Sequence, residues 1–308
     1  MDFRLFYNHS IHPELMHLEQ RRRRLVRLLL LAGLLLLGVV AVQVYLGIFL
    51  ITLLLLIPVG MGIAYLAFRI RVFFAEFKPR VVEAILDYID NDVNYSFTKY
   101  APQGSISKQQ FLASRIFTTA SDFWGEDLVV GQVRETPFEM SELRVREFSP
   151  VRDRLDYVFR GVFLIGDYKR WDMHGSVLLL PDAYRKYLSR SERAFHLLGG
   201  RRVQGNLLPD FEAFFDTYAT PEVRIQDVIS EELQVAILQF RKDFQEQNRQ
   251  KEIYLSIIGD KIYIALTQDR DLLEPSLWRN NVSYGLVREF YDDLSMLLDL
   301  VRHVDVMN

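Results

Sequence analysis

The chain has 308 residues, of which 50% are hydrophobic and 25% charged, a composition that excludes wholesale disorder. It has no cysteine, which excludes a disulfide scaffold, a thiol nucleophile and a zinc site built from thiolates. The net charge of −3 gives no case for nucleic-acid binding. The charge is divided unevenly: residues 1–80 carry 10 Lys and Arg against 4 Asp and Glu, and residues 81–308 carry 27 against 36. The two parts should therefore occupy different environments.

Residues 1–24 form a polar, basic segment that ends in four arginines. A helix can bring its histidines, His9, His12 and His17, together as a metal site, but no carboxylate-rich ligand set surrounds them. We therefore interpret residues 1–20 as a short mobile or interfacial segment and expect no metal there.

The chain is almost purely apolar from Leu25 to Phe68, and only Arg27 and Gln43 interrupt this run with strongly polar side chains. One transmembrane helix needs about 20 apolar residues, so residues 25–70 are predicted to form two transmembrane helices with a tight turn near residues 43–47. A cleaved signal peptide is the alternative, but its apolar region should have only about 7–15 residues. The spans contain no Asp, Glu or Lys, so they lack the usual mark of an ion or proton path.

Basic residues flank the apolar run on both sides. Because Lys and Arg are enriched on the cytoplasmic side of membrane helices, we expect the N-terminus and the C-terminal part to face the cytoplasm. The arginine run before the first span can also bind anionic lipid head groups, although a topology signal alone explains it. The residues taken to set the topology are Arg21, Arg22, Arg23, Arg24, Arg69 and Arg71.

Residues 71–308 are predicted to form one soluble α+β domain with a mainly antiparallel sheet. Apolar residues at helical spacing over residues 81–93 predict a helix that continues from the membrane. Ser107 is a predicted N-cap, and residues 127–180 are predicted to be strands. One face of the strand over residues 155–167 is predicted to carry Leu155, Tyr157, Phe159, Phe163 and Ile165.

The C-terminal third mixes helices and strands. Phe211, Phe214, Phe215 and Tyr218 share one face of a predicted helix, and Ser230 is predicted to cap another. Residues 252–258 and 261–266 are predicted strands joined by the two-residue turn at 259–260. Apolar spacing over residues 286–301 predicts a long amphipathic helix that ends the domain.

Candidate reactive groups are few. Asp122, Glu126 and Asp127 can bind a cation or act as acid and base, although a solvated loop explains them equally well. Asp167 joins them as a weak catalytic candidate. Histidines 174 and 196 have no nucleophile-elbow motif near them. Arg201 and Arg202 follow two glycines and are candidates for anion binding, with a helix C-cap and basic loop as the default interpretation.

Several segments resemble one known family. They are FKPRVVEAIL, FLASRIF, DFWGEDLVVG, YVFRGVFLIGDYKR, GSVLLLPD, PDFEAFFDTYATPEVRIQDVISEEL, IYLSIIGDKIYIAL and LLEP. In this order, over residues 70–308 with the preceding hairpin, they resemble the bacterial domain-of-unknown-function family 3137. The family usually has an arginine–tyrosine pair before a helix in this region, and the segment PEVRIQDVISEEL departs from that pattern. The resemblance implies a multi-pass protein of the bacterial cytoplasmic (inner) membrane. It transfers no catalytic residue or cofactor.

Three functions follow from these features. The first is a protein-binding or assembly module on a membrane anchor. Its expected partners are the bilayer and another protein, and it can form homo-oligomers. We expect it to bind no nucleic acid and no cofactor. The second is a membrane-anchored enzyme whose acidic candidates and Arg201 or Arg202 converge in one pocket. The third is a subunit of an oligomeric channel or transporter, since two uncharged spans cannot conduct alone.

Overall fold

The computed structural model describes residues 2–47, 49–149, 152–167, 175–182, 186–246, 251–268 and 273–306. The chain divides into two compact units. Unit 1 contains Met1–Tyr88 and Leu272–Tyr291, and unit 2 contains Ile89–Asp271 and Asp292–Asn308. Long apolar helices precede a mainly antiparallel sheet, which confirms the predicted α+β class.

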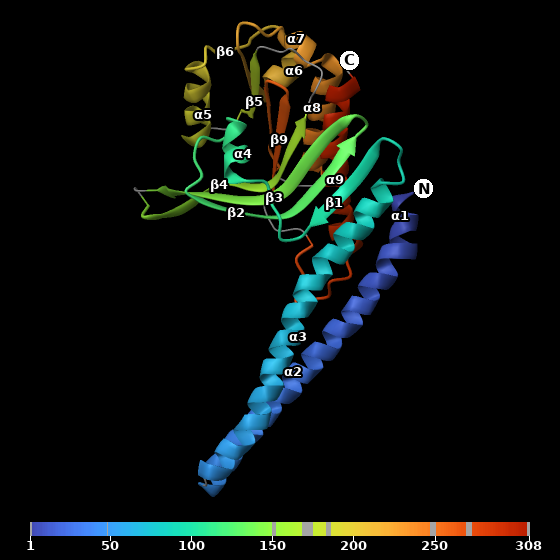
Figure 1. Cartoon of the computed structure of the whole chain (residues 1–308), viewed down its shortest axis with the longest axis vertical. Coiled ribbons are helices and arrows are strands. Elements are labelled where there is room, and N and C mark those ends of the chain that lie inside the picture. The colour runs from blue at the N-terminus through green and yellow to red at the C-terminus, as the bar shows by residue number, and fades with distance from the viewer. Residues whose placement is uncertain are drawn as a thin grey trace. The chain divides into compact units, whose positions relative to one another are not determined.

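Unit 1 is built on two long helices (Figure 1). The chain starts with α1 (Phe3–Phe6) and a π-helical segment (Tyr7–Ile11), and then continues into α2 (His12–Leu46). The segment expected to be mobile or interfacial is helical from Phe3 onward, because Phe3, Tyr7 and Ile11 are buried and hold these turns. Helix α3 (Phe49–Ile89) follows and contains two prolines, Pro58 and Pro79, within its span.

The turn after α2 depends on a glycine. Gly47 adopts φ +66°, and its N–H donates to the Gln43 carbonyl over 2.9 Å. This left-handed conformation ends a helix at little cost only when the residue has no Cβ. The helix boundary therefore lies inside the region in which the sequence predicted a turn.

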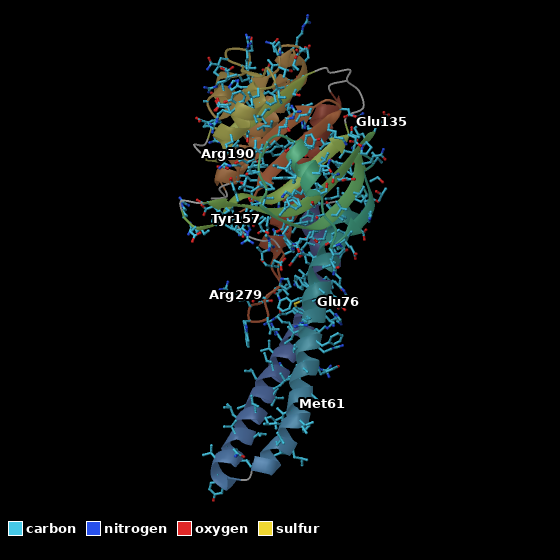
Figure 2. All side chains as sticks on the ribbon, turned by 60° about the vertical axis from the view of Figure 1, so that its left-hand side comes forward. Met61, Glu76, Glu135, Tyr157, Arg190 and Arg279 are labelled. Carbon is cyan, nitrogen blue, oxygen red and sulfur yellow. The ribbon has the colours of Figure 1, made fainter. Side chains whose placement is uncertain are left out.

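The apolar parts of α2 and α3 expose their side chains. Leu34 is 64% exposed, and Met61, which projects from α3 in Figure 2, is 70% exposed. Only 11% and 6% of the most apolar windows of the two helices are buried. Both helices are long and apolar enough to cross a membrane. A helix from the core of a soluble protein would bury such residues, so this surface indicates association with a membrane.

Aromatic rings join the chain's start to the later part of unit 1. Phe3 stacks on Tyr291 with 4.0 Å between ring centroids, and Tyr88 lies 5.4 Å from Phe3. Tyr7 meets Tyr284 edge-on at 4.9 Å. Lys78 also donates to Glu274 over 3.3 Å. These contacts attach residues 273–291 to the two long helices.

Unit 2 is organised around one sheet, which within the described residues has nine strands in the order β1-β2-β3-β4-β9-β8-β5-β7-β6. Every described strand pair is antiparallel. The hairpin over residues 253–267 has the predicted turn, with Gly259 at φ +61°. The strands are β1 (Tyr95–Ala101), β2 (Asp122–Val133), β3 (Thr136–Ser149), β4 (Arg154–Asp167), β5 (Ser176–Pro181), β6 (Arg201–Arg202), β7 (Phe215–Ala219), β8 (Ile253–Ile258) and β9 (Lys261–Thr267).

One face of the sheet packs against helix α4 (Lys108–Ala113). Ser107 caps this helix as predicted: its hydroxyl accepts from the Gln110 N–H, and the Gln110 side chain accepts from the Ser107 N–H. Phe111 is fully buried and stacks on Phe117 with 5.0 Å between ring centroids. The ring centroid of Phe163 on β4 lies 5.1 Å from that of Phe111. These rings form the centre of the core on this face.

The remaining helices are α5 (Lys186–His196), α6 (Pro209–Glu212), α7 (Ile225–Val228), α8 (Glu231–Glu246) and α9 (Tyr284–Val306). Ser230 precedes α8 and accepts from the Leu233 N–H over 3.3 Å, so the predicted cap is confirmed. The predicted helix carrying Phe211 and Tyr218 is wrong. The chain there forms short α6 and then β7, because β7 is paired on both sides, with β5 and with β6.

Candidate interaction surface on strands β2 to β4

The candidate functional surface is one face of the strand trio β2, β3 and β4, on the side opposite the phenylalanine core. We call it the open face. Its middle row consists of Trp124, Arg144 and Arg160, which lie directly opposite one another across the three strands. Residues opposite one another in an antiparallel sheet point to the same face. Trp124 is 44% exposed, whereas Leu143 and Val145, which alternate with Arg144, are fully buried on the other face.

A bulge in β4 places a tyrosine on this face. Val145 pairs with Phe159, but the next residue of β3, Arg146, pairs with Tyr157, so Val158 is an extra residue. One extra residue reverses the alternation of the strand beyond it. Tyr157 is therefore 54% exposed while Phe159 is buried, and Figure 2 shows the Tyr157 side chain at the margin of the sheet. The predicted single face carrying both residues is wrong for this reason.

Ion pairs hold the arginines of the open face in place. Arg146 donates from Nε to Asp122 Oδ2 over 2.7 Å. Arg144 lies 3.5 Å from Glu126 and 3.6 Å from Glu142, and its guanidinium carbon is 4.5 Å from the centroid of the Trp124 ring. Guanidinium groups favour this combination of carboxylate pairing and aromatic stacking.

A second bulge, in β2, forms the acidic corner of the face. The register between β2 and β3 shifts after Glu126, and Asp127 adopts φ +57°. Asp127 accepts a hydrogen bond from the Tyr100 hydroxyl over 2.6 Å. Carboxylate oxygens of Glu126, Asp127 and Glu142 lie within 4.8 Å of one another. Because Arg144 contacts two of these three carboxylates, the corner has the geometry of an ion-pair network.

The other predicted site residues lie elsewhere. Asp167, at the end of β4, accepts from Lys261 Nζ over 2.7 Å, and this hydrogen bond raises the pKa of Lys261. Arg201 and Arg202 form β6 at the far edge of the sheet, and Arg202 pairs with Asp216. Six strands separate β2 from β6 in the sheet order. The structure therefore places Asp122, Glu126 and Asp127 on β2, where carboxylate oxygens of Glu126 and Asp127 lie within 4.8 Å of each other and Asp122 lies four residues away at the start of the strand. It does not bring them together with Asp167 or the two arginines.

The glycines before Arg201 end helix α5, as the default interpretation expected, but the two arginines that follow form strand β6 and not a basic loop. Gly199 has φ +85°, and Gly200 donates to the Phe195 carbonyl over 3.2 Å after α5. The His196 ring nitrogen Nδ1 lies 2.7 Å from the Gly200 carbonyl oxygen, so this histidine closes the same helix end. Burial raises the pKa of Asp216, and the Arg202 charge opposes that shift. Histidine 174 lies outside the described residues.

The predicted topology arginines differ in how they are neutralised. Arg21 pairs with Glu76 at 2.5 Å, and Arg23 pairs with Glu19 at 3.0 Å. Arg22 is buried, binds Glu19 at 2.7 Å and donates to the Leu277 carbonyl over 2.5 Å. In contrast, no described carboxylate pairs with Arg24, Arg69 or Arg71.

Sequence reasoning missed the arginines of β3 and β4. The sequence signal available for them is the alternation in ELRVRE, where Arg144 and Arg146 alternate with Leu143 and Val145. Their partners cannot be found this way, because Asp122 and Tyr157 come from two different strands. The grouping of these side chains depends on the register of three strands and on the bulge at Val158.

These features define a class, an α+β domain that follows two helices apolar enough to span a membrane. Residues 157–306 match the family described as Protein of unknown function (DUF3137), so the expected family resemblance is confirmed over this C-terminal part. No curated protein matches the sequence. The mycobacterial trehalose monomycolate transport factor A, TtfA, is a weak structural neighbour with 10% identity and a TM-score of 0.34, over 72% of this chain and 96% of the TtfA chain.

Proposed function

We propose that this protein is a membrane-anchored binding module whose open face recruits another protein. The observation that carries the proposal is the grouping of exposed aromatic side chains and arginines on β2–β4. Trp124, Tyr157 and Phe148 are between 44% and 54% exposed, and Arg144 and Arg146 lie among them. Trp, Tyr and Arg are the residues most enriched at the energetic centres of protein interfaces.

The ion pairs favour binding because they order the surface before a partner arrives. A long arginine side chain costs about 0.5–1.5 kcal/mol to immobilise when it binds. Contacts of Arg146 with Asp122, and of Arg144 with Trp124, reduce this cost. The pairs also neutralise most of the charge on the face, so we expect the aromatic side chains to supply most of the affinity.

The anchor is proposed to be the helical hairpin within residues 25–70, followed by a soluble domain from residue 71. Arginines before the first span and after the second support a topology in which the N-terminus and the domain face the cytoplasm. We propose the bacterial inner membrane as the location, as the resemblance of the chain's segments to this family implies. The bilayer and one protein are the proposed partners, without nucleic acid, and a second copy of this chain is a possible partner.

Affinity purification after crosslinking in intact cells tests the proposal. Wild-type full-length protein is compared with Trp124→Ala/Tyr157→Ala and with a control, Val235→Ala, which removes an exposed apolar side chain from α8. We expect a defined partner whose recovery falls about tenfold or more in the double variant and is unchanged in the control. Equal recovery from all three proteins, or no protein above an untagged background, would reject a binding role for the open face.

A further inference from the structure

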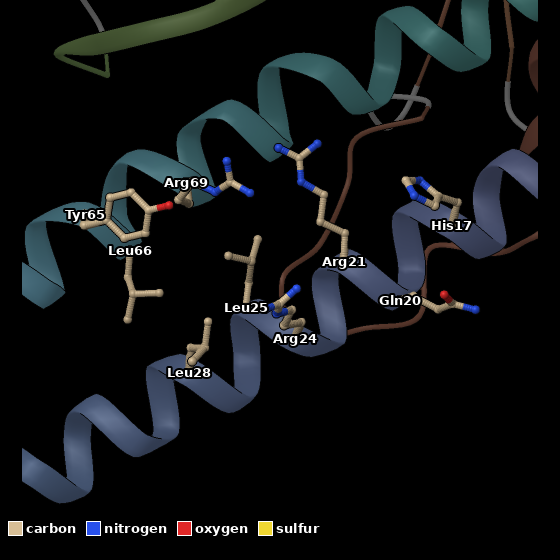
Figure 3. Close-up of a pocket in the computed structure, with 9 residues that line it drawn as sticks. All are labelled: His17, Gln20, Arg21, Arg24, Leu25, Leu28, Tyr65, Leu66 and Arg69. Atoms are coloured by element: carbon tan, nitrogen blue, oxygen red, sulfur yellow. The ribbon is translucent and has the colours of Figure 1, made fainter.

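A pocket lies between α2 and α3, where the basic segments meet the apolar run. Its volume is about 530 Å³, within the range of about 300–1,000 Å³ usual for ligand sites. Arginines 21, 24 and 69 line it from both helices, and Leu25, Leu28 and Leu66 line it on the side of the apolar run (Figure 3). All of these residues belong to unit 1.

The positive charge in this pocket is only partly neutralised. Arg21 pairs with Glu76, whereas Arg24 on α2 and Arg69 on α3 have no carboxylate partner among the described residues. Two guanidinium groups that line one pocket repel each other unless an anion joins them. Phosphate oxygens are suited to this role, because arginine can bind them with two parallel hydrogen bonds.

The position of the pocket further restricts the ligand. Arg24 is the residue immediately before the apolar run, and Arg69 is the residue immediately after it. Leu28 and Tyr65 also line the pocket and are 39% and 60% exposed. Tyrosine is enriched at the level of lipid head groups. The pocket thus combines a cationic end with an apolar end at the proposed boundary of the membrane.

We propose that this pocket binds the head group of an anionic phospholipid, with its phosphate held between Arg24 and Arg69 and the start of its acyl chains against Leu28 and Leu66. The inference depends on the membrane placement proposed above. It assigns to these arginines a binding role beyond topology. A soluble phosphate compound satisfies the arginines but leaves the leucines exposed, so a lipid is the occupant that matches both ends.

Native mass spectrometry of the full-length protein in neutral detergent tests this assignment. Phosphatidylglycerol and phosphatidylcholine are titrated against wild type, Arg24→Gln/Arg69→Gln, and a control, Arg27→Gln/Arg71→Gln. The control removes the same charge from the same two helices but alters no residue that lines the pocket. We expect one phosphatidylglycerol per protein, bound about tenfold more tightly than phosphatidylcholine, and about a tenfold loss in the pocket variant only.

Further arms separate the alternatives. Arg24→Lys/Arg69→Lys keeps the positive charge but loses the paired hydrogen bonds. It should bind phosphatidylglycerol with an affinity between those of the wild type and Arg24→Gln/Arg69→Gln. Circular dichroism checks that this variant folds as the wild type does. Equal loss in the pocket and control variants would overturn the site in favour of general attraction to negative charge. Binding of glycerol 3-phosphate as tight as that of lipid would overturn the lipid assignment. Extraction of the wild-type protein from membranes by alkaline carbonate would instead reject the membrane placement.

Discussion

Truncation of Phe111 to alanine should strongly destabilise the domain. The Phe111 side chain is fully buried between α4 and the sheet, and the rings of Phe117, Phe123, Phe159 and Phe163 have centroids within 6.0 Å of it. Four rigid neighbours cannot easily collapse into the space that is left. Replacement of a buried phenylalanine by alanine costs about 3–5 kcal/mol, and we expect about 4 kcal/mol at this position.

The matching change on the opposite face is Phe148→Ala. Phe148 lies on β3 and is 48% exposed, so its truncation should cost less than about 1 kcal/mol. A loss of 1 kcal/mol lowers the Tm of a domain of this size by about 2–4 °C. The expected shifts are therefore about 8–16 °C for Phe111→Ala and at most about 4 °C for Phe148→Ala.

Thermal unfolding of the full-length protein in detergent, followed by near-ultraviolet circular dichroism, measures these shifts. Phe111→Leu retains part of the side-chain volume and should give an intermediate Tm. If Phe111→Ala melted within about 2 °C of wild type while Phe148→Ala melted far lower, the assignment of the core and open faces would be reversed. The interaction surface would then need to be sought on the α4 side of the sheet.

Three further predictions concern other parts of the chain. Gly161→Ala should abolish recovery of folded protein, because its Cβ would lie 2.0 Å from the Leu266 carbonyl oxygen of β9. Gly199→Ala should cost about 1–2 kcal/mol in chemical unfolding, because φ at this position is +85° but no atom beyond the neighbouring residues lies within 4 Å of the new Cβ. Arg22→Ala should cost about 3 kcal/mol because it removes a buried ion-pair partner, and Arg27→Ala should leave the Tm nearly unchanged. Burial raises the pKa of Tyr95 above its usual range, and its hydrogen bond to Asp299 reinforces the shift. The resulting stabilisation is complete below about pH 10 and is lost at higher pH, because the tyrosine of the unfolded chain ionises first. Tyr95→Phe should therefore make the free energy of unfolding fall less steeply as the pH rises above about 10. An unchanged pH dependence would contradict the burial argument.

Elements with strong local signals could be predicted from the sequence. The apolar run, the caps at Ser107 and Ser230 and the turn at 259–260 each depend on residues close together in the chain. The structure of residues 211–218 could not be predicted in this way. The spacing of Phe211, Phe215 and Tyr218 matches a helix, but pairing with distant strands makes β7.

The candidate surface was predictable only in part. Three acidic residues of β2 were recognised because they are close together in sequence, but their arginine partners on β3 were not. The exposure of Tyr157 depends on the extra residue Val158, and the apolar residues Leu155, Tyr157 and Phe159 recur at every second position across it, as they would in a regular strand. A bulge of this kind is set by pairing with β3, so the sequence of β4 alone does not indicate it.

Site-specific photo-crosslinking from the open face tests the central proposal most directly. A photoreactive phenylalanine analogue replaces Tyr157 on the open face in full-length protein expressed in cells, and Val235 on α8 serves as the control position. The proposed function predicts one discrete adduct from position 157 that is absent at position 235 and is lost when Trp124→Ala is added. Diffuse labelling, equal adducts at both positions, or an adduct unaffected by Trp124→Ala would contradict it.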